Sequence, residues 1–233
     1  VRLRPGMYIG GKDERALHHM VAEIVDNSMD EAVAGHATWI EIELHENGHV
    51  TVRDNGRGIP TGPHPKDPSK SALEIIFCTL NAGGKFSGDS YETSGGLHGV
   101  GSSVVNALST LLEVSVKRDG KLYRMGFANG DKASELEEIG TCAKRDTGTT
   151  VRFMPDPKYF DSGKFLASRL RHVLRAKAVL CPGLKISLRN EISGENTVWQ
   201  YEGGLTDYLL EALGEHTPLL PPEPFVGHMN AGR

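Results

Sequence analysis

Residues 15–34 place the tightest constraint on how this chain can fold, because they form one long helical pattern with two chemically different faces. One face repeats at helical spacing and is almost entirely apolar; its members are Leu17, Met20, Val21, Ile24, Val25 and Ser28. Gly35 follows directly, at a position where glycine commonly ends a helix. Such a helix must bury its apolar face against a second layer, which the rest of the chain has to supply.

Alternating segments predict that the second layer is a β-sheet. Residues 38–44 and 48–53 alternate between apolar and polar side chains and flank Glu46-Asn47-Gly48, a hairpin signal. Further strands are expected at 112–118, 121–127, 149–154, 184–190 and 196–201, and further helices at 71–81, 98–109, 162–180 and 204–213. Residues 57–70 and the glycine-rich residues 82–99 are expected to be loops. The sum predicts an α+β fold, with helices packed against one mostly antiparallel or mixed sheet.

Composition limits the kinds of partner that this chain can have. Its formal net charge is −4, whereas a domain that grips nucleic acid mainly through the phosphate backbone is usually basic. The three cysteines, Cys78, Cys142 and Cys181, form no C-x-x-C pair and predict no disulfide framework, so we expect reduced thiols in a cytoplasmic protein. No stretch approaches the roughly 20 apolar residues of a membrane span, and the chain does not open with a signal peptide. No membrane partner is therefore expected.

The two ends of the chain indicate that it is a piece of a longer protein. It begins at Val1 without a methionine, and proline becomes frequent after the last predicted helix, at Pro218, Pro221, Pro222 and Pro224. We therefore expect one compact domain over residues 1–215 and a linker over residues 216–233.

The polar face of the first long helix is the first candidate functional feature. His19, Glu23 and Asn27 fall at successive i+4 positions, and Asp26 and Asp30 flank them. A solvated helix face is the simplest interpretation of such a stripe taken alone. However, asparagine is a poor residue for a helix interior, and Glu23 and Asn27 can present a base and an oxygen ligand for Mg²⁺ to the same point.

Two glycine-rich segments are further candidates, and each is weak alone. Residues 54–60 (DNGRGIP) fit ordinary turn chemistry, or else Asp54 accepts a hydrogen bond from an adenine amino group while Ile59 and Pro60 cover the ring. Residues 95–101 (GGLHGVG) precede a predicted helix and can offer backbone N–H groups to phosphate. They match neither a Walker A loop nor a Rossmann fingerprint. Lys85 adds a cation to the same glycine-rich stretch.

The order and combination of these motifs resemble those of the GHKL ATPases, a group that includes gyrase, chaperone, histidine-kinase and mismatch-repair ATPases. Residues 23–27 (EIVDN) resemble the N box of that group, and residues 54–60 and 95–101 resemble its two glycine boxes. Other segments are similar to bacterial type II DNA topoisomerase B subunits: 4–9 (RPGMYI), 26–32 (DNSMDEA), 82–86 (AGGKF), 97–101 (LHGVG) and 147–149 (TGT). Residues 140–145 and 177–183 resemble the topoisomerase IV type more than the gyrase type, which stays the alternative.

The resemblance implies a GHKL two-layer sandwich, with helices on one face of a mostly antiparallel mixed sheet, that binds ATP and Mg²⁺. It implies that Glu23 is the general base, that His19 supports it, and that Asn27 is the Mg²⁺ ligand. Asp54 matches the adenine-binding aspartate, and Thr149 matches a threonine that shares its water network. The other positions carried over are the pocket wall Arg57, Gly58, Ile59 and Pro60, the lid and phosphate residues Lys85, Leu97, His98, Gly99, Val100 and Gly101, and Arg118 at the pocket mouth. A charged hairpin tip remains the alternative for Arg118.

The resemblance also implies the setting of this domain. Residues 1–215 would form the ATPase domain, and residues 216–233 a linker with the truncated start of a transducer domain. The full enzyme would join an A-type, DNA-cleaving subunit in a heterotetramer, act on DNA by strand passage, and bind ATP-competitive inhibitors in the same pocket. Alone, the chain is expected to be a weakly active monomer.

Several interpretations stay open at this point. Lys164, Arg171 and Arg175 align on the predicted helix 162–180 and are placed to touch DNA, although a solvated basic face is the simpler interpretation. A chaperone, a mismatch-repair clamp or a histidine kinase is the rival within the GHKL group. A non-catalytic nucleotide-binding module is the rival of another class, and Glu23 argues against it because binding alone needs no base.

Overall fold

The computed structural model describes residues 1–65, 67–80, 101–214 and 227. The main sheet contains β1 (Trp39–Leu44), β2 (Val50–Asp54), β5 (Ser109–Arg118), β6 (Lys121–Ala128), β7 (Asp131–Lys132), β8 (Glu137–Thr141), β9 (Gly148–Pro155), β10 (Lys185–Asn190) and β11 (Glu195–Trp199). Its order is β11-β10-β1-β2-β9-β5-β6-β7, with β8 also paired to β6. Within this sheet β1 and β10 form the one parallel pair, and the other pairs are antiparallel.

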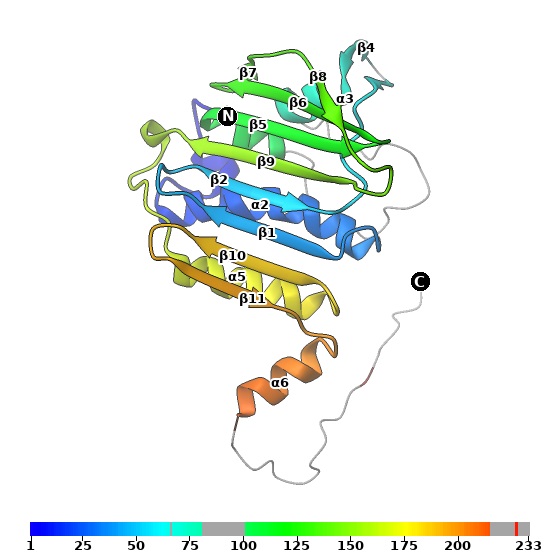
Figure 1. Cartoon of the computed structure of the whole chain (residues 1–233). Coiled ribbons are helices and arrows are strands. Elements are labelled where there is room, and N and C mark those ends of the chain that lie inside the picture. Colours follow the sequence, from blue (N-terminus) through cyan, green and yellow to red (C-terminus); the bar gives the residue numbers. More distant parts are fainter. Residues whose placement is uncertain (66, 81–100, 215–226, 228–233) are drawn as a thin grey trace.

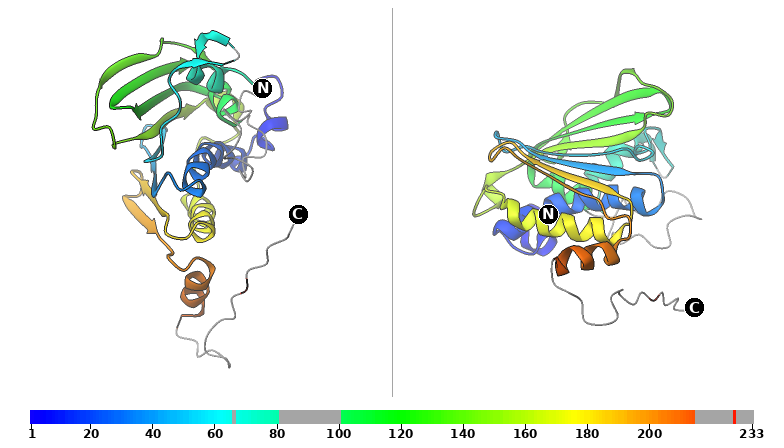
Figure 2. Two further views of the ribbon diagram at one scale, coloured as in Figure 1. Left: turned by 90° about the vertical axis from the view of Figure 1, so that its right-hand side faces the viewer. Right: turned by 60° about the horizontal axis from the view of Figure 1, so that its bottom comes forward.

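The helices lie on one face of this sheet, except the last one, which lies beyond the edge strand β11 (Figures 1 and 2). They are α1 (Gly6–Ile9), α2 (Glu14–Val33), α3 (Ala72–Cys78), α4 (Gly101–Ala107), α5 (Ala167–Leu180) and α6 (Leu205–Leu213), with a short 3-10 turn at Pro157–Tyr159. As a result, one face of the sheet is buried. In β1, Ile40, Ile42 and Leu44 are buried, and the residues between them are not. The predicted α+β arrangement of helices on a mostly antiparallel mixed sheet is therefore confirmed.

The α2 helix is central to this arrangement and forms for reasons that are local in the sequence. The side chain of Asp13 caps its start by accepting hydrogen bonds from the N–H groups of Arg15 and Ala16, at 3.0 and 3.3 Å. Gly35 follows its end with φ +78°, in the left-handed region that favours glycine. The apolar side chains of its inner face are buried, and each aliphatic one contributes about 1.5–3 kcal/mol of transfer free energy.

His18 joins α2 to the segment before α5. Its Nδ1 bonds the backbone oxygen of Glu14, and the N–H of Leu166 donates to its Nε2 at 2.9 Å. Because Nε2 accepts this bond, the ring is neutral with its proton on Nδ1. Burial lowers the pKa of His18, in keeping with the neutral ring.

Several expected boundaries were wrong. Residues 57–70 contain a small two-stranded sheet of β3 (Pro63–His64) and β4 (Asp67–Ser71), where a loop was expected, because two short proline-containing strands show no alternation. Among the described residues α1, β7 and β8 were not expected either. The helix expected at 162–180 begins at Ala167, since Leu166 is extended and bonds His18. The loop expected at 82–99 and the start of the helix expected at 98–109 lie outside the described residues, as does the linker expected at 216–233, except for Gly227.

The basic side chains near α5 do not form one open face. Lys164 precedes the helix, contrary to the expectation that it shares a face with Arg171 and Arg175. Arg171 pairs with Glu195 at 2.7 Å, and Arg175 donates to the hydroxyl of Tyr201 at 2.9 Å. These contacts attach α5 to the elements that follow it. Arg175 also pairs with Glu211 at 3.1 Å, so both arginine charges are paired with acidic side chains within the chain.

Two simpler expectations can be compared directly with the structure. The three cysteines are all free thiols, and burial raises the pKa of both Cys78 and Cys181. None of the described helices is long and apolar enough to cross a membrane.

Candidate functional site

The polar face of α2 brings His19, Glu23 and Asn27 onto successive turns. Nε2 of His19 lies 2.8 Å from Oε1 of Glu23, which is hydrogen-bonding distance. This hydrogen bond raises the pKa of His19, because the carboxylate stabilises the protonated ring. Both side chains remain partly exposed, at 45% and 30%, so water can reach the Glu23 carboxylate.

Gly101, the first residue of α4, lies directly against Glu23. A Cβ atom at position 101 would overlap Oε2 of Glu23 and would lie 3.1 Å from its Cβ. Only a residue without a side chain allows this approach. The structure therefore brings the start of α4 to the carboxylate that the sequence singles out.

Asn27 is linked to the next residue of α4. Its amide nitrogen Nδ2 donates a hydrogen bond to Oγ of Ser102 at 2.9 Å. Ser102 is buried, whereas Asn27 is exposed. Ser102 is the one polar partner of the Asn27 side chain among the residues that the structure describes, and none of those residues donates to the amide oxygen.

Asp54 ends β2 and is only 7% exposed. Its Oδ2 accepts the hydroxyl proton of Ser28 at 2.7 Å, and its Oδ1 accepts the N–H groups of Gly56 and Thr149 at 2.9 and 3.3 Å. Burial raises the pKa of Asp54 above its ordinary value, and these three hydrogen bonds oppose that rise. The result is a carboxylate in a fixed orientation that suits a hydrogen-bond donor such as an exocyclic amino group.

The residues after Asp54 are fixed to two neighbouring strands. The N–H of Ile59 donates to Oγ1 of Thr149 at 3.1 Å, and the Arg118 guanidinium donates to the backbone oxygen of Gly58 at 2.6 Å. Gly58 has φ +79°, and a Cβ there would lie 2.7 Å from the backbone oxygen of Lys117. Glycine is therefore required at position 58 for the loop to rest on the adjoining ends of β5 and β9.

Arg57 fixes the same loop to α2 through Glu31. Its Nε and its backbone N–H donate to Oε2 of Glu31 at 3.1 and 2.9 Å, and a second guanidinium nitrogen donates to Oε1 at 2.8 Å. Such a two-point pair restricts orientation more than a single contact does. In the same loop Ile59 packs against the core, whereas Pro60 is exposed.

Five of the expected lid and phosphate residues, Lys85, Leu97, His98, Gly99 and Val100, lie outside the described residues. The expected site residues that are described lie on α2, at the start of α4, at the end of β2 with the loop after it, and at the adjoining ends of β5 and β9. The described part of the chain holds no cluster of three His, Cys, Asp or Glu side chains suited to a metal ion. A metal ion here would need ligands from a bound molecule or from water as well.

Three polar side chains of this site were not among the expected site residues: Ser28, Glu31 and Ser102. Ser28 lies among apolar residues at helical spacing, which is itself a signal, because a hydroxyl buried on such a face needs a partner. Glu31 and Ser102 carry no local signal, since their partners come from distant segments of the chain.

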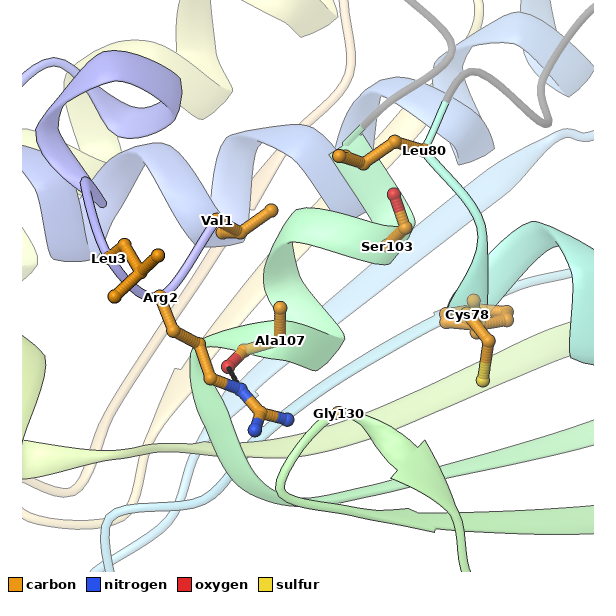
Figure 3. Close-up of a pocket in the computed structure, with 9 residues that line it drawn as sticks. Val1, Arg2, Leu3, Cys78, Leu80, Ser103, Ala107 and Gly130 are labelled. Atoms are coloured by element: carbon orange, nitrogen blue, oxygen red, sulfur yellow. Dashed lines mark hydrogen bonds between the residues drawn. The ribbon is translucent and has the colours of Figure 1, made fainter.

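A separate pocket of about 340 Å³ lies between the N-terminal residues, α3 and α4 (Figure 3). Its lining is mainly apolar, and Nε of Arg2 donates to the backbone oxygen of Ala107 at 3.1 Å beside it. None of the expected site residues lines this pocket. Ser103 does, while its neighbour Ser102 bonds Asn27, so successive residues of α4 have different surroundings.

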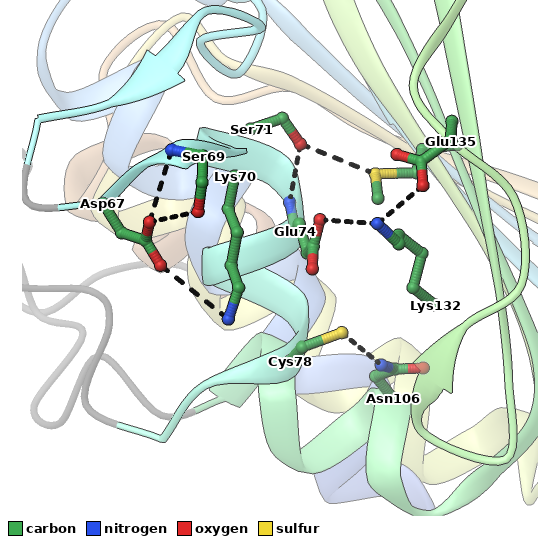
Figure 4. Close-up of polar contacts among 10 residues, drawn as sticks. Asp67, Ser69, Lys70, Ser71, Glu74, Cys78, Asn106, Lys132 and Glu135 are labelled. Atoms are coloured by element: carbon green, nitrogen blue, oxygen red, sulfur yellow. Dashed lines mark hydrogen bonds and ion pairs between the residues drawn. The ribbon is translucent and has the colours of Figure 1, made fainter.

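The α3 helix is joined to both α4 and the edge of the sheet (Figure 4). Oγ of Ser71 caps its start by accepting the N–H of Glu74 at 3.2 Å, and Nζ of Lys132 lies 3.1 Å from Oε2 of Glu74. At the other end, the amide nitrogen of Asn106 donates to the backbone oxygen of Phe77 at 2.9 Å. These contacts attach α3 to α4 and to β7.

Comparison with known proteins places the chain in a family. The sequence profile described as "Histidine kinase-, DNA gyrase B-, and HSP90-like ATPase" matches residues 12–158. The chain belongs to this family. The matched range spans His19 to Thr149, so the site residues expected in the histidine kinase-, gyrase B- and HSP90-like ATPases all fall within it.

Within these ATPases the chain is similar to bacterial topoisomerase proteins. It is 53% identical to the B subunit of DNA topoisomerase 4 from Pseudomonas aeruginosa over 233 residues, which is 100% of the chain and 36% of that protein. It is 54% identical to the B subunit of DNA gyrase from Thermotoga maritima over 209 residues, which is 90% of the chain and 32% of that protein. The chain spans about a third of the length of these curated relatives.

A solved structure agrees with the fold. The topoisomerase IV ATP-binding domain of Francisella tularensis, in complex with a small-molecule inhibitor, matches with a TM-score of 0.82 and 43% sequence identity. The match covers 100% of this chain and 60% of that one.

Proposed function

We propose that this chain is the ATP-binding and ATP-hydrolysing domain of a bacterial topoisomerase IV B subunit, where hydrolysis powers DNA strand passage in decatenation and relaxation. One observation carries the proposal: α2 contacts both halves of the proposed nucleotide site. Its polar face holds His19, Glu23 and Asn27, and its Ser28 holds Asp54. The topoisomerase IV relative that matches along the whole chain supports the choice of enzyme.

Glu23 is the proposed general base. Its carboxylate would take the proton of the water that attacks the terminal phosphate of ATP. The hydrogen bond from His19 would orient this carboxylate, and the close approach of Gly101 would fix it relative to α4. The partial exposure of Glu23 supports this role, because the attacking water must reach it.

Asp54 is the proposed acceptor for the adenine amino group. Its carboxylate is buried and held by Ser28, Gly56 and Thr149, so it would meet the base with little reorganisation. Ile59 and Pro60 would cover the ring, and Arg118 and Arg57 would hold the loop that carries them.

Mg²⁺ fits the Asn27 end of the site, because the amide oxygen there has no donor among the described residues. Mg²⁺ prefers oxygen ligands, keeps several waters and commonly takes further ligands from substrate phosphates, so one protein ligand is sufficient. When bound, the ion would neutralise charge on the ATP phosphates. Asn27 would hold it by its Oδ1.

The proposal extends to the partners of the whole enzyme. The protein would work in the cytoplasm in a heterotetramer with an A-type, DNA-cleaving subunit, and DNA would be bound by the full enzyme. The net charge of −4 supports the view that this domain is not the main DNA-binding surface. The inhibitor bound to the Francisella tularensis domain supports ATP-competitive inhibition of this chain as well.

A gyrase is the second candidate, favoured by the 54% identity to the Thermotoga maritima protein. The two candidates differ in the reaction of the assembled enzyme. The full-length protein, reconstituted with its A-type partner, should decatenate linked DNA circles without introducing negative supercoils. ATP-dependent negative supercoiling would instead identify a gyrase.

The nucleotide site is tested by calorimetric binding of a non-hydrolysable ATP analogue with Mg²⁺. We expect Asp54→Asn to abolish binding, since the adenine acceptor is lost. Asp156→Asn is the matched control, because Asp156 is also 7% exposed but bonds Lys158 at the opposite end of β9. Binding that survives Asp54→Asn, or that is lost equally in both variants, would remove the proposed adenine site.

Hydrolysis is tested in the full-length protein with Glu23→Ala. Nucleotide binding should persist while hydrolysis disappears, because the base acts on the attacking water and not on the ligand. If hydrolysis continues in this variant, Glu23 is not the general base.

A further inference from the structure

We infer that Ser102 is a positioning residue for Asn27, holding the amide nitrogen so that the amide oxygen faces the metal ion of the nucleotide complex. The inference rests on the proposed function, in which Asn27 is the Mg²⁺ ligand. Its structural basis is the hydrogen bond of 2.9 Å from Nδ2 of Asn27 to Oγ of Ser102.

The two ends of an amide are chemically opposite, which makes orientation matter. The oxygen accepts and the nitrogen donates, and a half-turn about the last side-chain bond exchanges them. A cation binds the oxygen end and is repelled by the N–H groups. In the structure the nitrogen end faces Ser102 and donates to its Oγ, which holds the amide in place with its oxygen end turned away from α4. The Ser102 hydroxyl thus anchors the orientation in which the amide oxygen can ligate a cation.

The asymmetry in exposure supports this role. Ser102 is buried at 8% exposure, whereas Asn27 is exposed. The hydroxyl is thus the fixed member of the pair, and the amide is the member that a ligand can reach. An exposed asparagine without such a partner would sample both orientations, and part of any metal-binding free energy would be spent on ordering it.

The position of Ser102 is itself fixed by the neighbouring contact. Gly101 lies against the Glu23 carboxylate so closely that no side chain fits between them. Ser102 follows on the same helix and meets Asn27, one turn further along α2. Two consecutive residues of α4 therefore contact the proposed base and the proposed metal ligand, so the two groups share one support.

The experiment measures how binding of a non-hydrolysable ATP analogue depends on MgCl₂, by calorimetry on this chain, with a parallel titration in EDTA. For Ser102→Ala we expect the Mg²⁺ concentration for half-maximal effect to rise roughly three- to tenfold, because one neutral hydrogen bond is lost. Affinity for the analogue in EDTA should not change. Ser102→Thr keeps the hydroxyl and should restore the wild-type Mg²⁺ dependence.

Ser109→Ala is the matched control, since the Ser109 hydroxyl is also buried and donates to the backbone oxygen of Val105 on the same helix, at 2.7 Å. It should lower the melting temperature without moving the Mg²⁺ dependence. If Ser102→Ala does not fold, Ser102→Cys replaces it, because a thiol is close in size and a weak acceptor.

The outcomes separate this inference from the function on which it rests. Mg²⁺-dependent binding in the wild type with an unchanged Mg²⁺ response in Ser102→Ala overturns the inference and leaves the proposed function intact. The same holds if Ser102→Thr behaves like Ser102→Ala, or if Ser109→Ala shifts the response equally. Wild-type binding that ignores Mg²⁺ overturns the metal role of Asn27 and the inference together, while the adenine site would stand.

Discussion

Ser28 and Asp54 are joined by a hydrogen bond of 2.7 Å, in which the serine hydroxyl donates to Oδ2 of the carboxylate. Both side chains are buried, at 3% and 7% exposure. The pair links the inner face of α2 to the end of β2. The hydrogen bond therefore ties the helix that carries Glu23, the proposed base, to the strand that ends in Asp54, the proposed adenine acceptor.

Ser28→Ala should destabilise the fold and weaken nucleotide binding. A hydrogen bond to a charged acceptor contributes about 1.5–3 kcal/mol, so we expect the free energy of unfolding to fall by roughly that amount. Ser109→Ala, which removes a buried hydroxyl from a neutral backbone acceptor, should cost only about 1 kcal/mol. Chemical denaturation of both variants checks the comparison, and an equal or smaller loss in Ser28→Ala would contradict it.

His18 and His19 should give opposite contributions to stability as pH changes. Burial holds the folded pKa of His18 below 6.5, so the unfolded chain takes up its proton first, and the contribution of His18 is lost as pH falls below about 6.5. The Glu23 hydrogen bond holds the folded pKa of His19 above 6.5. The contribution of His19 is therefore complete below about pH 6.5 and is lost as pH rises through the folded pKa.

Melting temperatures measured between roughly pH 8 and pH 5.5 can separate the two histidines, because this range spans the ordinary histidine pKa. On acidification His18→Gln should lose less stability than the wild type, and His19→Gln should lose more. His172→Gln serves as the control, since His172 is an exposed residue of α5. Parallel pH profiles for the His18 and His19 variants would contradict the prediction.

The parts of this fold that could be predicted are those that local chemistry decides. The apolar repeat, the Asp13 cap and Gly35 define α2, and helical spacing alone brings His19 next to Glu23. The hairpin of β1 and β2 is equally local, because alternation and Gly48 specify it.

The parts that could not be predicted depend on distant partners. Edge strand β8 (EEIGT) has little apolar alternation of its own and forms by pairing with β6. The start of α5 moves to Ala167 because Leu166 bonds His18, far away in the sequence. In the site, Ser102 shows the same limit, since nothing in its local sequence indicates that it faces Asn27.

Gly101→Ala should disable the proposed base while leaving the fold in place. The added Cβ would overlap Oε2 of Glu23, so the carboxylate must turn away from α4. Misplacing a catalytic group by about 1 Å can cost on the order of 100-fold in rate, so we expect hydrolysis by the full-length protein to fall by at least that factor. Gly163→Ala is the control, because a Cβ there meets nothing within 4 Å. Equal hydrolysis rates in the two variants would argue against the Gly101–Glu23 contact.

Arg57 and Glu31 should be energetically coupled, although the pair is partly exposed. The two side chains are 41% and 22% exposed, and pairs of this kind contribute about 0–1 kcal/mol. The two-point geometry favours the upper part of that range. Each residue also has other contacts, so a single substitution would overstate the free energy that the pair contributes. A double-mutant cycle of Arg57→Gln and Glu31→Gln isolates the free energy of the pair.

We expect a coupling free energy of about 0.5–1 kcal/mol from that cycle, measured by denaturant unfolding and reduced at high salt. The Lys121–Glu138 pair is the matched comparison. Its charged atoms are also 2.8 Å apart, but both of its side chains are more exposed, at 48% and 44%. That pair has a single flexible ammonium contact and should show coupling near zero. If the two cycles give the same value, residues 54–60 are attached to α2 by the Ser28–Asp54 hydrogen bond and the packing of Ile59, and not by the Arg57–Glu31 ion pair.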